Sequence, residues 1–507
     1  MTDTFDGIDL NADASDAATA AAAAASEIAA DAAAPLASAP KVGRVRPSRS
    51  ERRAAGAALR ATVPFDAHAE LAADEGDRDP IGLIEAQGRT RLPELLALRH
   101  GRMASSSFAF YRGAAAIMAG DLRAVPDTGI ISQLCGDAHL SNVGMFASPE
   151  RALLIDLNDF DETAPGPFEW DVKRMAASFE IAGRARGFSP EDRARLVTQL
   201  VVAYAEAIDE ASRTPVLEMA TARLDADAML ARVKGALRPE IAARMTRAIA
   251  KTRQRDSADA VARLAERADG TYRFRTNAPT LVPLRSLSEL TGLDEHTAVS
   301  RVEGMLAGYQ SSLTEAHARI LDRFQVVDIA LKVVGVGSVG TRAWVVLLTG
   351  NGKRDVLVLQ AKEAQRSVLE DPTQPSAFAH QGQRVVHGQR RLQAFGDVLL
   401  GYTHVVGFDG NERDFYVRQF RDWKGSAEPE RMERSTMRLY AEFCGIVLAR
   451  AHARGGDAAL IAGYVGDGRE FAEALLRFSS AYADRTERDH AALLAAIESG
   501  RLAAVAP

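Results

Sequence analysis

The sequence predicts an α+β fold in which helical segments flank a single β-rich unit. The first indication is a set of three runs rich in Val, Leu and Ile within residues 326–424, separated by turns as in antiparallel strands. The second is that apolar residues before and after this unit recur at helical spacing. The 507 residues suffice for two or three domains, or for one two-part protein with extensions.

The first predicted segment, residues 1–60, is an Ala-rich tail with a basic patch. Up to about residue 45 few large apolar side chains are available for burial, so we expect this part to be disordered. The basic patch consists of Lys41, Arg44, Arg46, Arg49, Arg52 and Arg53. We interpret it as a solvated part of the tail in preference to a phosphate-binding site.

The second segment, residues 79–325, is predicted to be mainly helical. Ser189-Pro190-Glu191-Asp192 has the signature of a helix start, with Ser at the N-cap and Pro at the first helical position. From about residue 170 to 321 the pattern is mostly helical. The elements expected before that point are helices over residues 81–98 and 108–122 and short strands over 130–134 and 152–155.

The third segment, residues 326–424, is the β-rich unit. Strands are predicted over residues 328–336, 341–349 and 355–361, with Asn351-Gly352 favouring a tight hairpin between the last two. A helix over residues 381–394 follows. The fourth segment, residues 425–507, is predicted to be helical, because apolar side chains from Met437 to Ala451 line one face.

The composition indicates a cytoplasmic protein. A net charge of −6 gives no overall attraction to nucleic acid or to anionic membranes. Two cysteines cannot form a disulfide framework, no apolar run is long enough to cross a membrane, and the first residues lack the features of a secretion signal. We therefore expect neither a nucleic-acid nor a membrane partner.

Two polar segments carry the chemistry: Leu134-Cys-Gly-Asp137-Ala-His139-Leu-Ser-Asn142 and Leu153-Leu-Ile-Asp156-Leu-Asn-Asp159-Phe-Asp161. An acid, an Asn five residues later and a second acid after an apolar run are the layout of a phosphoryl-transfer site. Asp137 would orient an attacking hydroxyl, while Asn142 and Asp156 would hold Mg²⁺ against nucleotide phosphates. Asp159 and Asp161 stay alternative metal ligands, since Asp156 is preferred only because it ends the predicted strand.

His139 is a further candidate catalytic residue. It lies two residues after Asp137, where an imidazole could contact substrate or phosphate. A histidine that only packs the loop is an equally good interpretation, and both stay open.

A glycine loop follows much later in the chain, as Gly335-Val-Gly337-Ser-Val-Gly340. In a dinucleotide-binding fold such a loop opens a helix. Here the next residues, 341–349, include Trp and two valines and end at a turn, so they predict a strand. A strand, a glycine turn and a second strand form the arrangement that covers ATP phosphates in kinases.

Lys362 lies at the end of the third predicted strand, where kinases place the lysine that binds the α- and β-phosphates. The alternative is an edge-strand lysine that keeps the sheet soluble. A Glu partner for this lysine is not evident. Glu370 precedes Asp371-Pro372, which disfavours a helix there, and the helix over 381–394 offers Gln and Arg.

The segment Cys135-Gly-Asp137-Ala-His139-Leu-Ser-Asn142 resembles the catalytic loop of aminoglycoside phosphotransferases and choline kinases. This resemblance implies that Asp137 is the catalytic base, Asn142 a Mg²⁺ ligand and Asp156 the principal metal carboxylate. Cys135 stands where those enzymes have His. Trp170-Asp171 is similar to their helix start, in which the Asp is mainly structural.

From about residue 80 the whole chain resembles a bacterial family called domain of unknown function 2252. The motifs that carry this resemblance are Gly136–Asn142, Asn158–Glu162, Gly166–Asp171, Gly335–Gly340 and Gln383–Val386. The glycine loop follows the Asp137 loop by about two hundred residues, which reverses the order of ordinary kinases. The simplest explanation is a circularly permuted, protein-kinase-like two-lobed fold.

In that fold residues 326–424 would form the nucleotide lobe, and residues 425–507 would complete the larger lobe. The helix leading into the Asp137 loop would be 436–454 or 108–122. The predicted function is an ATP- and Mg²⁺-dependent phosphotransferase with a small-molecule hydroxyl acceptor, because no activation segment is evident. The alternatives are a nucleotide-binding pseudokinase, an AMP-transferring enzyme and, on Asp137-Ala-His139 alone, a two-metal hydrolase.

Overall fold

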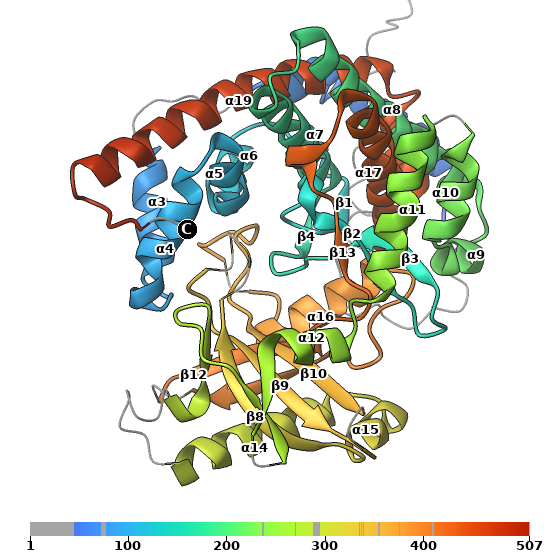
Figure 1. The fold of residues 1–507 in the computed structure, drawn as a ribbon. Coiled ribbons are helices and arrows are strands. Elements are labelled where there is room, and N and C mark those ends of the chain that lie inside the picture. The colour runs from blue at the N-terminus through green and yellow to red at the C-terminus, as the bar shows by residue number, and fades with distance from the viewer. Residues whose placement is uncertain are drawn as a thin grey trace, which may run out of the picture.

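The computed structural model describes residues 45–71, 78–235, 238–268, 270–286, 295–333, 335, 337, 339–352, 355–374, 376–407 and 410–505. The protein is α+β, with helices and several antiparallel sheets, as the sequence predicts. Figure 1 shows a large sheet at one end of the molecule and a group of long helices at the other. We call the described residues of 257–419 the sheet region, and those of 45–253 and 425–505 the helical region.

The sheet region is built on six strands in the order β11-β12-β10-β9-β8-β7, and all neighbours are antiparallel. Three of the strands were predicted, each to within a few residues, together with the hairpin after Thr349. The other three lay outside the prediction. The bounds are β7 Leu281–Pro283, β8 Gln325–Lys332, β9 Ala343–Thr349, β10 Val356–Glu363, β11 Gly401–Val406 and β12 Glu412–Gln419.

Helices cover both faces of this sheet. On one face α14 (Glu295–Ser311) packs its Tyr309 in a cluster with Trp344 and Leu359. On the other face α12 (Ser257–Leu264) packs its Val261 in a cluster with Val358. Alternation along β10 places Val358, Gln360 and Lys362 on the α12 face. The Lys362 end of that face points toward the helical region. Two further helices belong here, α15 (Glu315–Leu321) and α16 (Gln381–Leu392).

The helical region is centred on long helices that pack closely together. Ser189 accepts a hydrogen bond from the amide of Asp192 and so caps α8, as predicted. Gly445 lets α17 approach α8, because a Cβ there would lie 2.3 Å from the carbonyl oxygen of Leu200. The bounds are α7 Phe168–Ala185, α8 Pro190–Arg213, α17 Arg434–Gly455, α18 Ala458–Val465 and α19 Arg469–Glu498.

The structure differs from the predicted tail over residues 49–60. Helix α2 (Arg49–Ala58) begins with a capping box made by Ser48 and Glu51. Arg52 forms an ion pair of 2.6 Å with Asp457, so part of the basic patch is bound to the helical region and is not solvated tail. Residues 1–44, the rest of the predicted tail, lie outside the described residues.

Shorter helices complete the region, and two predicted helices are each divided in two. The predicted helix 81–98 ends at Gly88 and resumes at Leu96, and the predicted helix 108–122 is interrupted at Ala114. The bounds are α3 Pro80–Gly88, α4 Leu96–Ala104, α5 Ser107–Gly113, α6 Ala115–Arg123, α9 Val216–Thr221, α10 Ala226–Lys234 and α11 Pro239–Arg253. Among the helices that the structure describes, none combines the length and apolar character that crossing a bilayer requires.

Three small sheets complete the fold. The hairpin of β5 (Ala265–Ala268) and β6 (Thr271–Phe274) lies in a segment predicted to be helical. The other two sheets frame the Asp137 loop: β1 pairs with β4, and β2 pairs with both β3 and β13. Their bounds are β1 Ile131–Leu134, β2 Val143–Ala147, β3 Leu153–Leu157, β4 Ala164–Pro167 and β13 Gly425–Ser426.

Candidate functional site

Asp171, at the start of α7, holds the loop between β1 and β2 in place. The carboxylate of Asp171 accepts hydrogen bonds from the amides of Cys135 (2.7 Å) and Gly136 (3.0 Å). Gly136 has a φ of +90°, and a Cβ there would lie 2.1 Å from the carbonyl oxygen of Glu162. Only glycine fits this turn, which fixes the backbone immediately before Asp137.

Asp137 faces the space between the two regions, with 22% of its side chain exposed. Its Oδ1 lies 2.5 Å from Nε of Arg174, a buried residue of α7. Burial acts to lower the pKa of Arg174, but the Asp137 carboxylate outweighs it and raises that pKa. The guanidinium therefore stays charged and fixes one oxygen of Asp137, which leaves the other oxygen for a ligand.

His139 belongs to the frame of the loop. It is buried, and its Nδ1 accepts a hydrogen bond of 3.2 Å from the amide of Ser141. Burial lowers the pKa of His139 to about 4, so the imidazole is neutral at pH 7. Its Nε2 lies 3.8 Å from the Asp137 carboxylate. This position allows the ring to support Asp137, and direct contact with a substrate stays a prediction.

Asn142 is buried beside the same loop. Its Nδ2 donates a hydrogen bond of 2.5 Å to the carbonyl of Asp137. Among the described residues no hydrogen bond reaches its Oδ1. The side chain is therefore oriented by its nitrogen and keeps its oxygen available as a metal ligand.

Lys362 brings the sheet region into contact with the segment after β3. Its Nζ lies 2.6 Å from Oδ2 of Asp161 and 3.5 Å from Oδ1 of Asp159. Burial acts to lower the pKa of Lys362, but the two carboxylates outweigh it and raise that pKa. The hydroxyl of Tyr416 donates to the other oxygen of Asp161. β10 lies between β9 and β12, so the interpretation of Lys362 as an edge-strand residue is wrong.

Asp159 is the most accessible acid of this cluster, with 38% of its side chain exposed. Burial acts to raise its pKa, but Lys362, followed by Arg418 and Lys424, lowers it, so the carboxylate is charged. No hydrogen bond within the described residues reaches its Oδ1, an atom shielded from solvent. The Arg418 guanidinium, together with burial, lowers the pKa of Lys424 to about 7. Asp159 is thus surrounded by cations.

Asp156 does not join this cluster. Its Oδ2 lies 3.2 Å from Arg454 of α17, and its Oδ1 accepts a hydrogen bond of 2.9 Å from the amide of Leu157. Burial raises the pKa of Asp156. The strand β3 extends through Leu157, so Asp156 lies inside the strand and Asp159 follows its end. The preference for Asp156 assumed a strand that ends two residues earlier, at residue 155.

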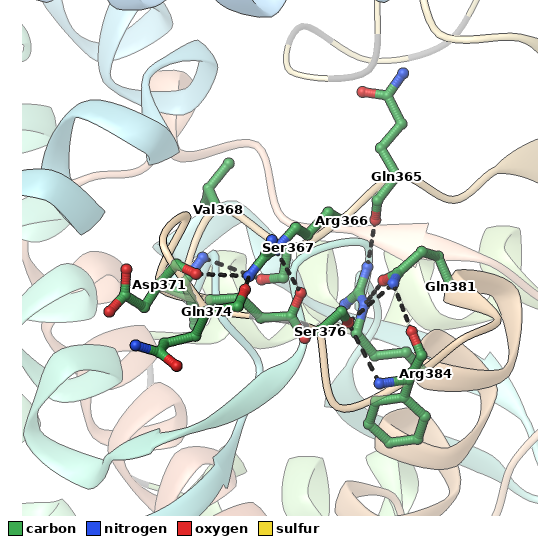
Figure 2. A network of polar contacts seen from close by, with 12 residues as sticks. Gln365, Arg366, Ser367, Val368, Asp371, Gln374, Ser376, Gln381 and Arg384 are labelled. Atoms are coloured by element: carbon green, nitrogen blue, oxygen red, sulfur yellow. Dashed lines mark hydrogen bonds and ion pairs between the residues drawn. The ribbon is translucent and has the colours of Figure 1, made fainter.

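Arg384 lies on α16, the predicted helix that offers no Glu to pair with Lys362. It is fully buried and donates to the carbonyls of Asp161 (2.8 Å), Gln365 (2.8 Å) and Thr163 (2.5 Å). Figure 2 shows this side chain pointing from its helix toward the carbonyl of Gln365. Glu370 pairs with Arg366 at 3.2 Å instead of with Lys362. The lysine's partners are therefore the aspartates, and Arg384 positions their backbone.

The glycine loop is tied to the first helices of the helical region. Gly335 and Gly340 have φ values of +61° and +89°, which favour glycine. Arg91 donates to the carbonyl of Gly337 (2.8 Å), and Arg102 donates to that of Gly335. In Figure 1 the loop between β8 and β9 rises toward α4 and α5. These two arginines lie outside every motif of the sequence, so nothing in the pattern pointed to them.

The connection from β12 to β13 is held by residues that precede α12. The amide of Trp423 donates to the carbonyl of Arg255 (2.8 Å), and Arg255 donates to the carbonyl of Lys424 (3.2 Å). Next to this connection Asn158, Arg418 and Lys424 help line a small cavity of about 60 Å³.

Residues 91–496 match the model of a protein family described as an uncharacterized protein conserved in bacteria, DUF2252. The chain belongs to this family. The match covers the Asp137 loop, the aspartates and Lys362, and it confirms the family resemblance drawn from the motifs. Neither the curated proteins nor the solved structures give a significant match to the chain.

Within the DUF2252 match, the structure brings Lys362 into contact with Asp159 and Asp161, and Asp137 lies close enough to act on the charge of Asp159. Asn142 is bonded to the Asp137 backbone, and Asp156 pairs with Arg454 instead. In the part of the chain that the structure describes, no three His, Cys, Asp or Glu side chains form a metal-binding group. Asp159 and Asn142 each keep one oxygen without a hydrogen bond from described residues. That pair is the donor set on offer to a metal in this cleft.

Proposed function

We propose that this chain is an ATP- and Mg²⁺-dependent phosphotransferase with a permuted, kinase-like arrangement of two lobes. The observation that carries the proposal is the ion-pair cluster that joins Lys362 of β10 to Asp159 and Asp161. A strand lysine beside a metal-type aspartate is what phosphoryl transfer requires. The order of segments along the chain differs from that of ordinary kinases, but the same kinds of side chain meet.

In this proposal Lys362 binds nucleotide phosphates below the glycine loop. Two carboxylates that are 30% and 38% exposed keep its ammonium charged. The Lys362 side chain itself is 5% exposed, so phosphate oxygens would replace part of its contact with these acids. Gly335 and Gly340 let the loop backbone turn without a Cβ, which allows close approach to phosphates. Arg418 adds a second positive charge near Asp159.

Mg²⁺ fits this cleft because it is usually held by one or two carboxylates or amides together with substrate phosphates. Asp159 would be the main protein ligand and Asn142 the second, through the two oxygens described above. When bound, the ion would neutralise charge on the phosphates. Asp161 is a poorer ligand, since both of its oxygens are already held, by Lys362 and by Tyr416.

Asp137 would accept the proton of the acceptor hydroxyl and orient that hydroxyl for in-line attack. Arg174 holds one carboxylate oxygen at 2.5 Å, so the carboxylate cannot rotate freely and presents its other oxygen to the cleft. The neutral His139 supports the same carboxylate from within the loop. A fixed base of this kind orients its substrate without reorganising.

The proposed permutation is supported by the packing of α17. His452 of this helix lies 3.4 Å from Asp171, which holds the Asp137 loop, and the hydroxyl of Tyr440 donates to the carbonyls of Leu140 and Val143. The α17 helix, expected over residues 436–454, is therefore the one packed behind the loop. In this chain α17 follows the sheet region. In kinases the corresponding helix likewise follows the N-terminal lobe.

One observation favours a second candidate, a nucleotide-binding protein without transfer activity. Arg384 stands where a kinase carries the Glu that pairs with the lysine. The two candidates differ in one variant. If the protein transfers phosphate, Asp137→Ala abolishes the transfer and leaves ATP binding. If the protein only binds nucleotide, there is no transfer to lose, and Asp137→Ala leaves ATP binding unchanged.

The test is a thermal-shift titration with ATP, with and without Mg²⁺, on the wild type and on Lys362→Ala and Asp159→Asn. We expect Mg²⁺-dependent stabilisation of the wild type that both variants weaken. Asp156→Asn is the matched control, since it makes the same chemical change three residues away, on the α17 side of β3. A folded wild type that does not respond to ATP, or a response that only Asp156→Asn weakens, would overturn the proposal.

A further inference from the structure

A cavity of about 440 Å³ lies between α4, α5, the end of α7 and the segment after β13. Its lining includes Arg102, Arg112, Arg186, Ser105, Ser106 and Glu430. This volume suits a small metabolite. The charge of the lining is unusual, because three guanidinium groups face one carboxylate.

The three arginines differ in exposure: Arg102 and Arg112 are partly buried, and Arg186 is exposed. None of them forms an ion pair with a carboxylate among the described residues. Arg112 lies over the ring of Phe108 at 5.9 Å, and its Nε is shielded from solvent without a hydrogen bond to any described group. Like charges gathered around one space repel one another, and an anion bound there would relieve that repulsion.

The cavity adjoins the proposed transfer site on two sides. Arg102 donates to the carbonyl of Gly335, and a Cβ on Gly337 would lie 3.2 Å from the carbonyl of Arg112. The glycine loop therefore touches the cavity wall. On the other side Arg174, which holds Asp137, also donates to the carbonyl of Tyr111 at 3.0 Å, next to Arg112. An acceptor in this cavity could extend its hydroxyl toward Asp137.

We propose that this cavity binds the anionic group of the acceptor, so that the substrate is a small alcohol carrying a carboxylate or a phosphate. The proposal rests on the phosphotransferase function given above. The acceptor oxygen would form a bond to the γ-phosphorus of ATP while the bond from that phosphorus to the bridging oxygen breaks. ADP leaves, and the hydroxyl proton passes to Asp137. Planar guanidinium groups bind both kinds of anion in bidentate fashion.

The test measures binding of glycerol 3-phosphate, glycerate and glycerol by calorimetry to the wild type and to Arg112→Gln, Arg186→Gln and Arg469→Gln. We expect one or both anionic probes to bind, glycerol not to bind, and the first two variants to weaken binding about tenfold or more, the effect of a lost charge-assisted hydrogen bond. The probe that binds shows whether the anionic group of the acceptor is a phosphate or a carboxylate. Arg469, with 82% of its side chain exposed on α19, is the control and should change nothing.

Because Arg186 lies on the surface at the end of α7, its variant tests the cavity even if Arg112→Gln fails to fold. Failure of both anions to bind, equal binding of glycerol, or equal affinity in all variants would overturn the proposal. The Mg²⁺–ATP response of the same proteins is measured separately. Anion binding without an ATP response would contradict the phosphotransferase function and support the anion site. An ATP response without anion binding would support the phosphotransferase function and contradict the anion site.

Discussion

Two buried lysines of this protein, Lys362 in the cleft and Lys173 inside the helical region, are both placed beside acids but with opposite electrostatic results. The carboxylates around Lys362 outweigh the effect of burial and raise its pKa. For Lys173 the effect of burial outweighs that of the nearby carboxylates and lowers the pKa to about 8. Burial also raises the pKa of Glu169, one helical turn earlier, to about 7.

The difference lies in how close the acids are and how exposed they are, because Lys362 has two carboxylates within 4 Å whereas no ion pair joins Lys173 to a carboxylate among the described residues. Lys362 has two partners whose side chains are 30% and 38% exposed, so water stabilises their charges. Glu169 is fully buried and accepts hydrogen bonds from the amide (2.6 Å) and hydroxyl (3.0 Å) of Thr128. We call Lys173 and Glu169 the sealed pair, because both side chains are buried; at a pKa of about 8 this lysine is still mostly protonated at pH 7. The carboxylates around Lys362, in contrast, reach the solvent.

The largest expected effect comes from removing an acid of the open cleft. Asp137→Ala should lower phosphoryl transfer by about 10²- to 10⁴-fold, the usual contribution of a positioned base. ATP binding should be largely kept, since Asp137 is placed to contact the acceptor. The measurement is ADP formation with an acceptor found by screening, together with the ATP thermal shift. An equal loss of ATP binding would contradict the role of base.

The next effect separates the two lysines directly. Lys362→Met should weaken Mg²⁺–ATP binding about tenfold or more, because charge-assisted bonds to phosphate are lost. Lys173→Met should leave ATP binding unchanged and shift stability by about 1 kcal/mol or less, since an apolar side chain can fill the place of a buried lysine. Calorimetric titration with ATP and thermal unfolding of both variants check this. If Lys173→Met weakened ATP binding as strongly, the contrast between the two lysines would be lost.

The smallest effect concerns the sealed pair and pH. The folded-state pKa of Glu169 is raised to about 7 from 4.5, so its stabilising contribution is complete below pH 4.5 and is lost as pH rises through 7. Glu169→Gln removes this titration while keeping an oxygen for Thr128. Between pH 5 and pH 8 the wild type should lose up to about 3 kcal/mol relative to the variant. The thermal midpoints of both proteins at the two pH values measure this, and parallel pH profiles would contradict it.

Much of the cleft could be predicted because each part carries a local signature. The run from Asp137 to Asn142 and the strand ending near Lys362 are short patterns whose spacing reflects a single chemistry. Which of Asp156, Asp159 and Asp161 holds a metal stays a prediction. The preference for Asp156 depended on where one strand stops, and β3 continues two residues further than predicted, so that Asp156 lies inside the strand and pairs with Arg454.

The residues that hold the cleft together were beyond prediction. Arg384, Arg91 and Arg102 act through backbone carbonyls of segments far away in the chain, so no local spacing marks them. The strands β11 and β12 were missed as well, since polar residues such as Arg413 and Asp414 interrupt their apolar pattern. Which carbonyl an arginine meets is decided only once the tertiary fold is formed.

The pairing of β13 with β2 has a consequence for how the protein is made. Met145 lies opposite Gly425, so the sheet beneath the Asp137 loop lacks its third strand until residue 425 has left the ribosome. A nascent chain would carry the loop for most of its synthesis with the edge of β2 unpaired, and unpaired edges promote association with other chains. Pairing over such a separation in sequence is also slow. Production of this protein should therefore depend on synthesis rate and on chaperones that shield that edge.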